Sequence, residues 1–180
     1  MTDFMDIIKG RRSIRNYQAK EIPEEILNDI LQAVRWSPSW ANTQCWEAII
    51  VRDQGLKEAL AATLGKANPA QKAMTAAPVV LALCGKVKSS GYYKGQAATK
   101  FGDWLMFDLG IVAQNICLTA YSKGLGTVIV GLFDNAKAVE ILGVPEGYEL
   151  LVFIPVGYPG KESPAPKRRE ISDFIHQDKF

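Results

Sequence analysis

The densest cluster of chemically useful side chains is Arg11-Arg12-Ser13-Ile14-Arg15, which places three guanidinium groups and one hydroxyl within five residues. A guanidinium presents a planar fork that binds pairs of phosphate or carboxylate oxygens, and it keeps its charge when it is partly buried. The cluster therefore predicts a clamp for a phosphorylated or electron-rich ligand. A solvated basic turn is the alternative interpretation, and the spacing alone leaves it open.

A second basic cluster, Lys167-Arg168-Arg169, lies near the end of the chain. One interpretation is that both clusters converge on a single phosphate, each cation adding a charge-assisted hydrogen bond of about 1.5–3 kcal/mol. The other interpretation is two unrelated patches on the surface, and both remain open at this point.

Residues 37–46 combine small polar side chains with large aromatic ones, and the stretch Ser37-Pro38-Ser39-Trp40-Ala41-Asn42 has the composition of a loop. Polar groups beside aromatic rings suit a flat, partly polar heterocycle. We expect Trp46 in the core, whereas Trp40 fits either the core or a ligand pocket.

The remaining reactive side chains exclude several kinds of catalysis. The sequence has one histidine, His176, and its three cysteines, Cys45, Cys84 and Cys117, form no C-x-x-C pair. A histidine-rich zinc site and a dithiol redox motif are therefore excluded, and a Ser-His-Asp mechanism would depend on a single residue near the end of the chain. We expect no metal site, buried cysteines that act as small hydrophobes, and a cofactor that supplies any difficult chemistry.

The glycines Gly124, Gly126 and Gly131 do not form a dinucleotide-binding motif. They follow a predicted helix and precede a predicted strand, which reverses the Rossmann order, and their spacing is different. Gly124 fits the end of a helix, while Gly131 indicates either a close approach of the backbone to a ligand or a bulge.

The composition is that of one ordered globular domain over residues 1–180. The chain is 48% hydrophobic and 22% charged, which allows one substantial core and argues against disorder. Its 21 basic and 19 acidic residues give a net charge of +2, so no nucleic-acid partner is expected. The N-terminal residues carry no apolar signal core and the cysteines no disulfide framework, so a cytoplasmic location is expected.

Alternating helices and strands must position these residues. Apolar residues that recur every three or four positions predict helices over residues 3–9, 23–36, 54–64, 103–123 and 135–142. Apolar runs predict strands over residues 47–52, 78–84, 126–133 and 149–156. Strands separated by helices predict a sheet that is covered on both faces.

The helix predicted over residues 103–123 is apolar on nearly every face. A membrane span is the alternative, but Asp108, Gln114 and Asn115 fall inside the helix, so a buried central helix is favoured. Because buried amides need hydrogen-bond partners, we expect Gln114 and Asn115 to bond to neighbouring backbone.

Two segments carry little core of their own. Residues 89–100 are rich in Gly, Ser and Tyr, and we expect a mobile surface loop there. The extended tail over residues 163–180 must dock on something, and a partner subunit is the expected place.

These motifs, in this order, resemble the FMN-dependent nitroreductase family over the whole chain. The resemblance rests on the arginine cluster and on the further stretches Ser37 to Trp46, Ala77-Pro78-Val79-Val80, Asp108 to Ala120, Gly124-Leu125-Gly126-Thr127, Pro155-Val156-Gly157-Tyr158-Pro159 and Pro166-Lys167-Arg168-Arg169. Each motif is weak alone, and their joint order is specific.

The resemblance implies an α+β fold, built as a three-layer α/β/α sandwich with a long buried central helix and a C-terminal extension onto the partner subunit. It also implies a homodimer that holds tightly bound FMN between its subunits. The cofactor-binding residues implied by the resemblance are Arg11, Ser13 and Arg15 at the flavin pyrimidine edge and ribityl chain, and Arg12, Lys167 and Arg169 at the phosphate.

The resemblance assigns the remaining contacts to other parts of the chain. Pro38, Ser39, Trp40 and Asn42 are implied to reach the flavin from the other subunit. A backbone amide at Val130-Gly131 is implied to face flavin N5, and Gln71 to reach the pyrimidine ring. No protein nucleophile is implied, because the flavin carries the chemistry, and Trp40 is a candidate for the substrate pocket.

The implied activity is the transfer of electrons from NADH or NADPH, by a ping-pong mechanism, to nitroaromatics, quinones or similar flat small-molecule acceptors, with no membrane partner. Alternatives are another flavin chemistry such as reductive dehalogenation, a non-catalytic FMN-binding or storage protein, and a basic interaction module. Two departures bear on the acceptor: Trp40 is bulky where the family has small residues, and Cys45 stands where proline is frequent. Residues 86–100 are the candidate for the variable region that shapes substrate access.

Overall fold

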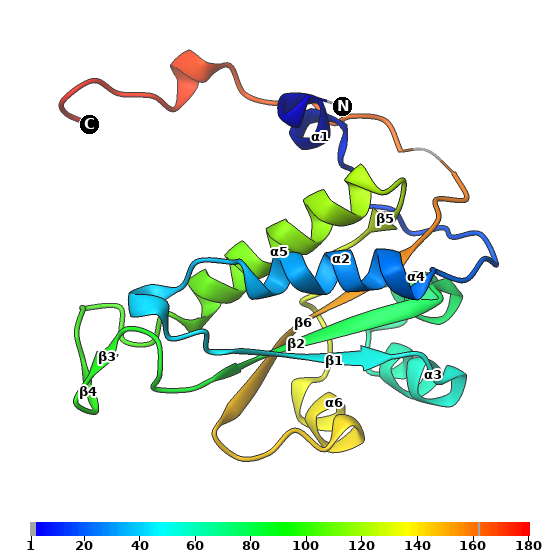
Figure 1. Ribbon diagram of the computed structural model, residues 1–180, viewed down its shortest axis with the longest axis horizontal. Coiled ribbons are helices and arrows are strands. Elements are labelled where there is room, and N and C mark those ends of the chain that lie inside the picture. The colour runs from blue at the N-terminus through cyan, green and yellow to red at the C-terminus, as the bar shows by residue number, and fades with distance from the viewer. Residues whose placement is uncertain (1–2, 162) are drawn as a thin grey trace.

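The computed structural model describes residues 3–161 and 163–180, and at its centre is a four-stranded antiparallel sheet (Figure 1). The strand order is β1 (Trp46–Val51), β2 (Val79–Lys86), β6 (Tyr148–Gly157) and β5 (Gly126–Thr127). The strands β1 and β5 form the edges, and β2 and β6 form the middle of the sheet.

Helices cover both faces of this sheet, which confirms the predicted α+β sandwich of three layers (Figure 1). One face packs against α2 (Glu24–Arg35) and α5 (Leu105–Ser122), and the other against α3 (Gln54–Ala62), α4 (Gln71–Ala76) and α6 (Asn135–Leu142). The smaller elements are α1 (Phe4–Gly10), η1 (Trp40–Asn42), the hairpin strands β3 (Tyr92–Tyr93) and β4 (Gln96–Ala97), and η2 (Ile171–Asp173).

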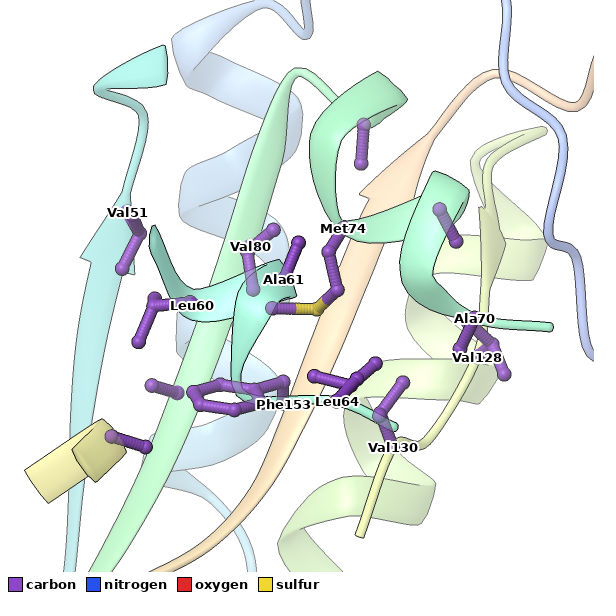
Figure 2. Close-up of a cluster of buried hydrophobic side chains, with 14 of the residues drawn as sticks. Val51, Leu60, Ala61, Leu64, Ala70, Met74, Val80, Val128, Val130 and Phe153 are labelled. Atoms are coloured by element: carbon purple, nitrogen blue, oxygen red, sulfur yellow. The ribbon is translucent and has the colours of Figure 1, made fainter. Parts of the chain in front are cut away.

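The strand β2 forms the centre of two hydrophobic cores because its side chains alternate between the faces. Val80, Ala82 and Cys84 belong to the core under α3, α4 and α6, where Met74 and Phe153 are also buried (Figure 2). Val79, Leu81 and Leu83 belong to the core under α2 and α5. This double burial explains the unbroken apolar run in β2.

The helix α5 is buried on one side and exposed on the other. Leu109, Val112 and Ile116 are fully buried against the sheet, whereas Met106 is 65% and Phe107 is 60% exposed. By length and composition this helix could cross a membrane, but its contacts with the sheet and with α2 make it the central helix of the core. The prediction of a buried central helix is confirmed on the side that faces the sheet, while an apolar stripe remains open along the outside.

One predicted strand needs correction, and two elements were not predicted. The strand predicted over residues 126–133 ends at Thr127, and an isolated bridge from Val130 to Phe153 follows, because the chain then turns and the Asp134 amide bonds to the Thr63 carbonyl. The helix α4 was not predicted, since it has six residues and no side-chain cap. The segment 89–100 lies mostly at the surface and contains the β3–β4 hairpin, and its mobility stays a prediction.

The tail over residues 163–180 runs past α1 and ends away from the sheet (Figure 1). It has one short 3-10 helix, η2, and leaves Ile171 at 72% and Ile175 at 56% exposure. The chain's own core therefore does not cover the apolar side chains of the tail. Docking of the tail on a partner subunit stays a prediction.

Candidate functional site

Some of the polar and aromatic residues selected from the sequence line two hollows, which lie near opposite ends of α5. The first, here called the Arg11 pocket, has a volume of about 450 Å³, and Tyr121 near the end of α5 lines it together with Arg11, Arg12 and Lys161. The second, the Trp40 cleft, has a volume of about 320 Å³. Its lining residues are Pro38, Ser39, Trp40, Trp104, Phe107, Asp108 and Ile111.

The arginine cluster is held in place by the edge strand β5. Ser13 forms a parallel bridge with Thr127, and the Ile14 amide donates to the Thr127 carbonyl at 2.8 Å. The Ile14 side chain is buried so close to Gly126 that a Cβ on Gly126 would lie 2.5 Å from Ile14 Cγ1. Gly126 is therefore needed for this close approach rather than for a nucleotide-binding loop.

Tyr17 connects the same segment to strand β6 of the sheet. Its hydroxyl lies 2.9 Å from the Ile14 carbonyl and 3.0 Å from the Pro155 carbonyl. Burial raises the pKa of Tyr17 above its ordinary value, so the hydroxyl remains protonated and can donate to these oxygens. The backbone of the arginine cluster is thus anchored to the sheet.

The cations of the Arg11 pocket have different partners. The Arg12 guanidinium donates to the Lys9 and Arg11 carbonyls at 2.5 and 2.8 Å, so it stabilises the end of α1. Arg11 makes no salt bridge within residues 3–161 and 163–180. Lys161, which was not predicted from the sequence, lines the same pocket. A pocket with these cations suits an anion such as a phosphate.

The second basic cluster lies outside this pocket in the single chain. Lys167 and Arg169 are exposed, and the Arg169 guanidinium donates to the Asp173 carbonyl within the tail. The predicted convergence of the two clusters is therefore absent from the protomer. Its occurrence in an assembled protein stays a prediction.

Six other predicted contact residues do not line either hollow. Ser13 lies beside Thr127, and Asn42 lines a neighbouring hollow with Arg35 and Gln44. The other four are Arg15, Gln71, Val130 and Gly131. Arg15 is exposed, and the Gln71 amide donates to the Ala61 and Leu64 carbonyls at 3.3 and 3.5 Å, joining α4 to α3. The Val130 amide is engaged by the Phe153 carbonyl at 2.9 Å. Gly131 is exposed, and a Cβ there would have room, with Val152 3.6 Å away. Of the two predicted backbone amides, Gly131 is thus the more accessible to a ligand.

The Trp40 cleft begins at a tightly folded turn. Ala41, Asn42 and Gln44 all have positive φ angles of 44°, 54° and 47°, which non-glycine residues adopt at an energetic cost. Bonds within the turn offset this cost: the Gln44 amide donates to Ser39 Oγ at 2.9 Å, and the Gln44 side chain donates to Asn42 Oδ1 at 3.2 Å. The turn therefore has a defined shape.

The central helix supports this turn from behind. Asn115 donates to Ser37 Oγ at 2.8 Å, so its amide holds a side chain rather than the neighbouring backbone that was expected. Gln114 is exposed on the outer face of α5, and its predicted burial was wrong. A half-buried Trp46 packs against the core as predicted.

The walls of the Trp40 cleft are aromatic. The ring centroids of Trp40 and Trp104 are 5.2 Å apart, and those of Trp104 and Phe107 are 5.3 Å apart. Trp104 and Phe107 come from the start of α5, and their contribution was not predicted because nothing in the local sequence connects them with Trp40. Beneath the rings lies the buried carboxylate of Asp108.

No group of three His, Cys, Asp or Glu side chains is placed to hold a metal ion in the part of the chain that the structure describes. Thr127 Oγ1 is buried beside the Arg11 pocket and has no hydrogen-bond partner among the described residues, although Cys117 lies next to it. The hollows thus combine cations and an unpaired hydroxyl at one end of α5 with aromatic rings at the other. These are the groups that a phosphorylated aromatic cofactor requires.

An antiparallel sheet between two layers of helices, with a cationic pocket and an aromatic cleft, is compatible with a flavin-binding oxidoreductase. Residues 8–74 and 61–158 match the nitroreductase family. A protein of Methanothermobacter thermautotrophicus named "Putative NADH dehydrogenase/NAD(P)H nitroreductase" is 32% identical over 182 residues, which cover 99% of this chain and 88% of that protein.

Solved structures agree with this match. An FMN-dependent nitroreductase from Clostridium difficile has a TM-score of 0.78 at 25% identity, covering 98% of this chain and 99% of that one. An iodotyrosine deiodinase bound to FMN and 3-iodo-L-tyrosine has a TM-score of 0.82 at 22% identity, covering 99% and 100%, and shows a shared fold.

The chain belongs to the nitroreductase family. This finding confirms the resemblance recognised in the sequence and, at the level of the family, the assignment of the chain as an oxidoreductase of the nitroreductase type.

Proposed function

We propose that the protein is an FMN-dependent oxidoreductase that passes electrons from NADH or NADPH to a flat acceptor such as a nitroaromatic or a quinone. One observation carries this proposal: the cations of the Arg11 pocket and the aromatic rings of the Trp40 cleft form two half-sites at opposite ends of α5. An exposed apolar stripe separates the two half-sites. We further propose that a homodimer joins the Arg11 pocket of one subunit to the Trp40 cleft of the other.

The geometry of α5 supports the dimer. An 18-residue helix is about 27 Å long, and its exposed face carries Met106 and Phe107 near the start and Tyr121 near the end. When two copies pair across a two-fold axis with these helices antiparallel, the end of one α5 meets the start of the other. Each half-site then faces its complement, and the apolar stripe is covered.

The residues of the Arg11 pocket fit the polar end of FMN. Arg11 and Lys161 supply cations for the phosphate, and Arg12 fixes the backbone that carries Arg11. Ser13 is partly exposed beside Thr127 and can bond to the ribityl chain. Arg15 would stabilise negative charge at the pyrimidine edge.

The aromatic half-site supplies the apolar wall that an isoalloxazine ring and a flat acceptor need. Trp40 and Trp104, with Pro38 and Ser39, offer such a wall to the partner subunit. FMN held there would supply the redox chemistry of a ping-pong reaction, in which NADH or NADPH is the hydride donor and the second substrate is the electron acceptor. The chain's own residues bind, orient and exclude water, and no protein nucleophile is required.

The free cysteines support the proposed cytoplasmic location. Cys45, Cys84 and Cys117 are buried and unpaired. Such thiols are usual in a reducing compartment.

The experiment is a purification followed by anaerobic reduction. The proposal expects a yellow dimer in gel filtration whose flavin absorbance is bleached by NADH or NADPH and restored by a nitroaromatic or a quinone. A yellow protein that is not bleached would be a storage protein. Bleaching without turnover on these acceptors would indicate another flavin chemistry. A colourless protein would refute the proposal.

The variant Arg11→Ala tests the phosphate clamp. Its flavin dissociation constant should rise at least about tenfold, since a charged hydrogen bond of about 1.5–3 kcal/mol is lost. Flavin fluorescence on dilution measures this constant. Arg52→Ala is the matched control, because Arg52 is exposed in a surface pair with Glu24 at the far edge of the sheet. Equal flavin retention in both variants would remove Arg11 from the site.

A further inference from the structure

The carboxylate of Asp108 is fully buried at the base of the Trp40 cleft. It accepts hydrogen bonds from the Trp40 backbone amide at 3.1 and 3.2 Å, from Ser90 Oγ at 2.6 Å and from Cys45 Sγ at 3.6 Å. These donors come from three separate segments of the chain. A single side chain thus ties the turn at η1, the loop before α5 and the start of β1 to the central helix.

The carboxylate of Asp108 has all its hydrogen-bond partners within the protein. Asp108 lies in the first turn of α5, and its carboxylate has three donors, as a buried polar group requires. Burial, followed by the charge of Asp108, raises the pKa of Cys45 to about 11, so its thiol remains protonated and can donate. The network is therefore complete without a cation.

The network also determines how the two tryptophans meet. Trp40 is held through its own amide, and Trp104 through a bond from its amide to the Ser90 carbonyl at 3.1 Å. Trp104 Nε1 also donates to Thr99 Oγ1 at 2.7 Å, inside the loop that Ser90 anchors. Since Ser90 and the Trp40 amide share the Asp108 carboxylate, that carboxylate sets the 5.2 Å separation of the two rings.

We infer that Asp108 is a positioning residue for the second substrate: it holds Trp40 and Trp104 in the arrangement on which the ring of a planar aromatic acceptor stacks. The consequence for catalysis rests on the proposed function, whereas the consequence for the tryptophan pair does not. Aromatic rings stack with a strong dependence on their separation and tilt, so a displaced wall binds a planar acceptor more weakly.

The test uses Asp108→Asn in the full-length protein as purified. An asparagine keeps the volume but has an NH2 group where one carboxylate oxygen accepts, so it cannot accept all three bonds. The first measurement is the exciton couplet of the two indoles in far-ultraviolet circular dichroism, with Trp104→Phe as the reference for its complete loss. The couplet should shrink clearly in Asp108→Asn and stay unchanged in Asp29→Asn, where a half-exposed carboxylate pairs with Lys123.

The second measurement compares two kinds of electron acceptor, with rates expressed per bound flavin. For a planar quinone or nitroaromatic, KM should rise about tenfold in Asp108→Asn, as expected when one hydrogen bond of the wall is lost. For ferricyanide, which does not stack, kcat/KM should stay unchanged. A loss of the same size for both acceptors would indicate a general structural defect and overturn the inference.

Ser90→Ala provides a second variant in case Asp108→Asn does not fold. It removes one donor of the network and should raise the KM for planar acceptors in the same direction, without adding to the effect of Asp108→Asn in the double variant. Additive effects would overturn the inference. If the protein proves colourless, the proposed function fails, but the exciton couplet still tests the role of Asp108. If Asp108→Asn is active and its couplet and KM are unchanged, the inference about Asp108 is refuted and the proposed function is unaffected.

Discussion

At the scale of single residues, the molecule uses buried polar groups to hold surface segments in place. Tyr17 fixes the arginine cluster to β6, and Asp108 fixes the Trp40 turn to α5. Lys57 is likewise buried and donates to the Ala77 carbonyl at 2.8 Å, which joins α3 to the end of α4. In each case one buried side chain joins two segments through hydrogen bonds, because an unpaired buried polar group would be costly.

The buried thiols predict a loss of stability in alkaline solution. Burial raises the pKa of Cys45 and of Cys84 to about 11, from the ordinary value of 9.0. Unfolded thiols therefore ionise first, so this stabilisation is complete below pH 9 and is lost as the pH rises from 9 to 11. The midpoint of urea unfolding should fall across that range.

The control for this prediction is the double variant Cys45→Ala/Cys84→Ala. It should be less stable at every pH because it leaves cavities, yet its unfolding midpoint should fall less steeply above pH 9. A slope as steep as that of the unchanged protein would show that other groups cause the alkaline loss. Tyr17 is one such group, since burial also raises the pKa of its hydroxyl.

At the scale of the elements, the apolar patterns predict the structure well wherever a segment is long. The run Pro78–Cys84 was predicted as a strand that is buried on both faces, and in the structure the strand Val79–Lys86 forms the centre of the sheet. Helix α4 was not predicted, and the strand that became β5 was predicted to be too long. Elements of six residues or fewer show little periodicity, so they depend on tertiary contacts.

The same distinction applies to the site. Arg11 and Ser13 could be selected because their neighbours in the sequence are also their neighbours in space. Lys161, Trp104 and Asp108 could not, since they reach the hollows through packing between distant segments. Asp108 had one visible signal, a carboxylate within an apolar helix, and that signal was used only to argue against a membrane span.

The N-terminus of α3 gives a prediction at this scale. Asp53 caps the helix by accepting a hydrogen bond from the Leu56 amide at 2.7 Å. Asp53→Ala should reduce the free energy of unfolding by about 1 kcal/mol, as measured by urea unfolding. Asp53→Ser retains a capping oxygen and should cost much less. A cost of the same size for both variants would show that the cap is not the cause.

At the scale of the whole molecule, the protomer exposes more apolar surface than its fold needs. Met106, Phe107 and Leu132 are each at least 60% exposed, and Ile171 in the tail is 72% exposed. Large exposed apolar patches usually mark an interaction site. These side chains lie on α5, after β5 and in the tail, which are the segments that the proposed dimer would cover.

The exposed face of α5 predicts the effect of a charge on assembly. Met106→Glu would bury two carboxylates across the two-fold axis, so the dimer dissociation constant should rise at least about a hundredfold. Light scattering coupled to gel filtration measures this change, and the flavin content should fall with it. Leu56→Glu, at an exposed site on α3, is the control. A stable Met106→Glu dimer would move the interface elsewhere.

The tail allows its docking and its cations to be tested separately. Truncation after Gly160 removes the tail together with Lys161 and Ser163, which line the Arg11 pocket, whereas truncation after Ser163 keeps both residues. Because the apolar side chains of the tail find no cover in their own chain, both truncations should weaken the dimer. The shorter protein should lose more flavin, since it also lacks a cation of the pocket. Gel filtration and the ratio of flavin to protein absorbance measure the two effects, and an intact yellow dimer after truncation at Ser163 would show that residues 164–180 serve neither the interface nor the cofactor.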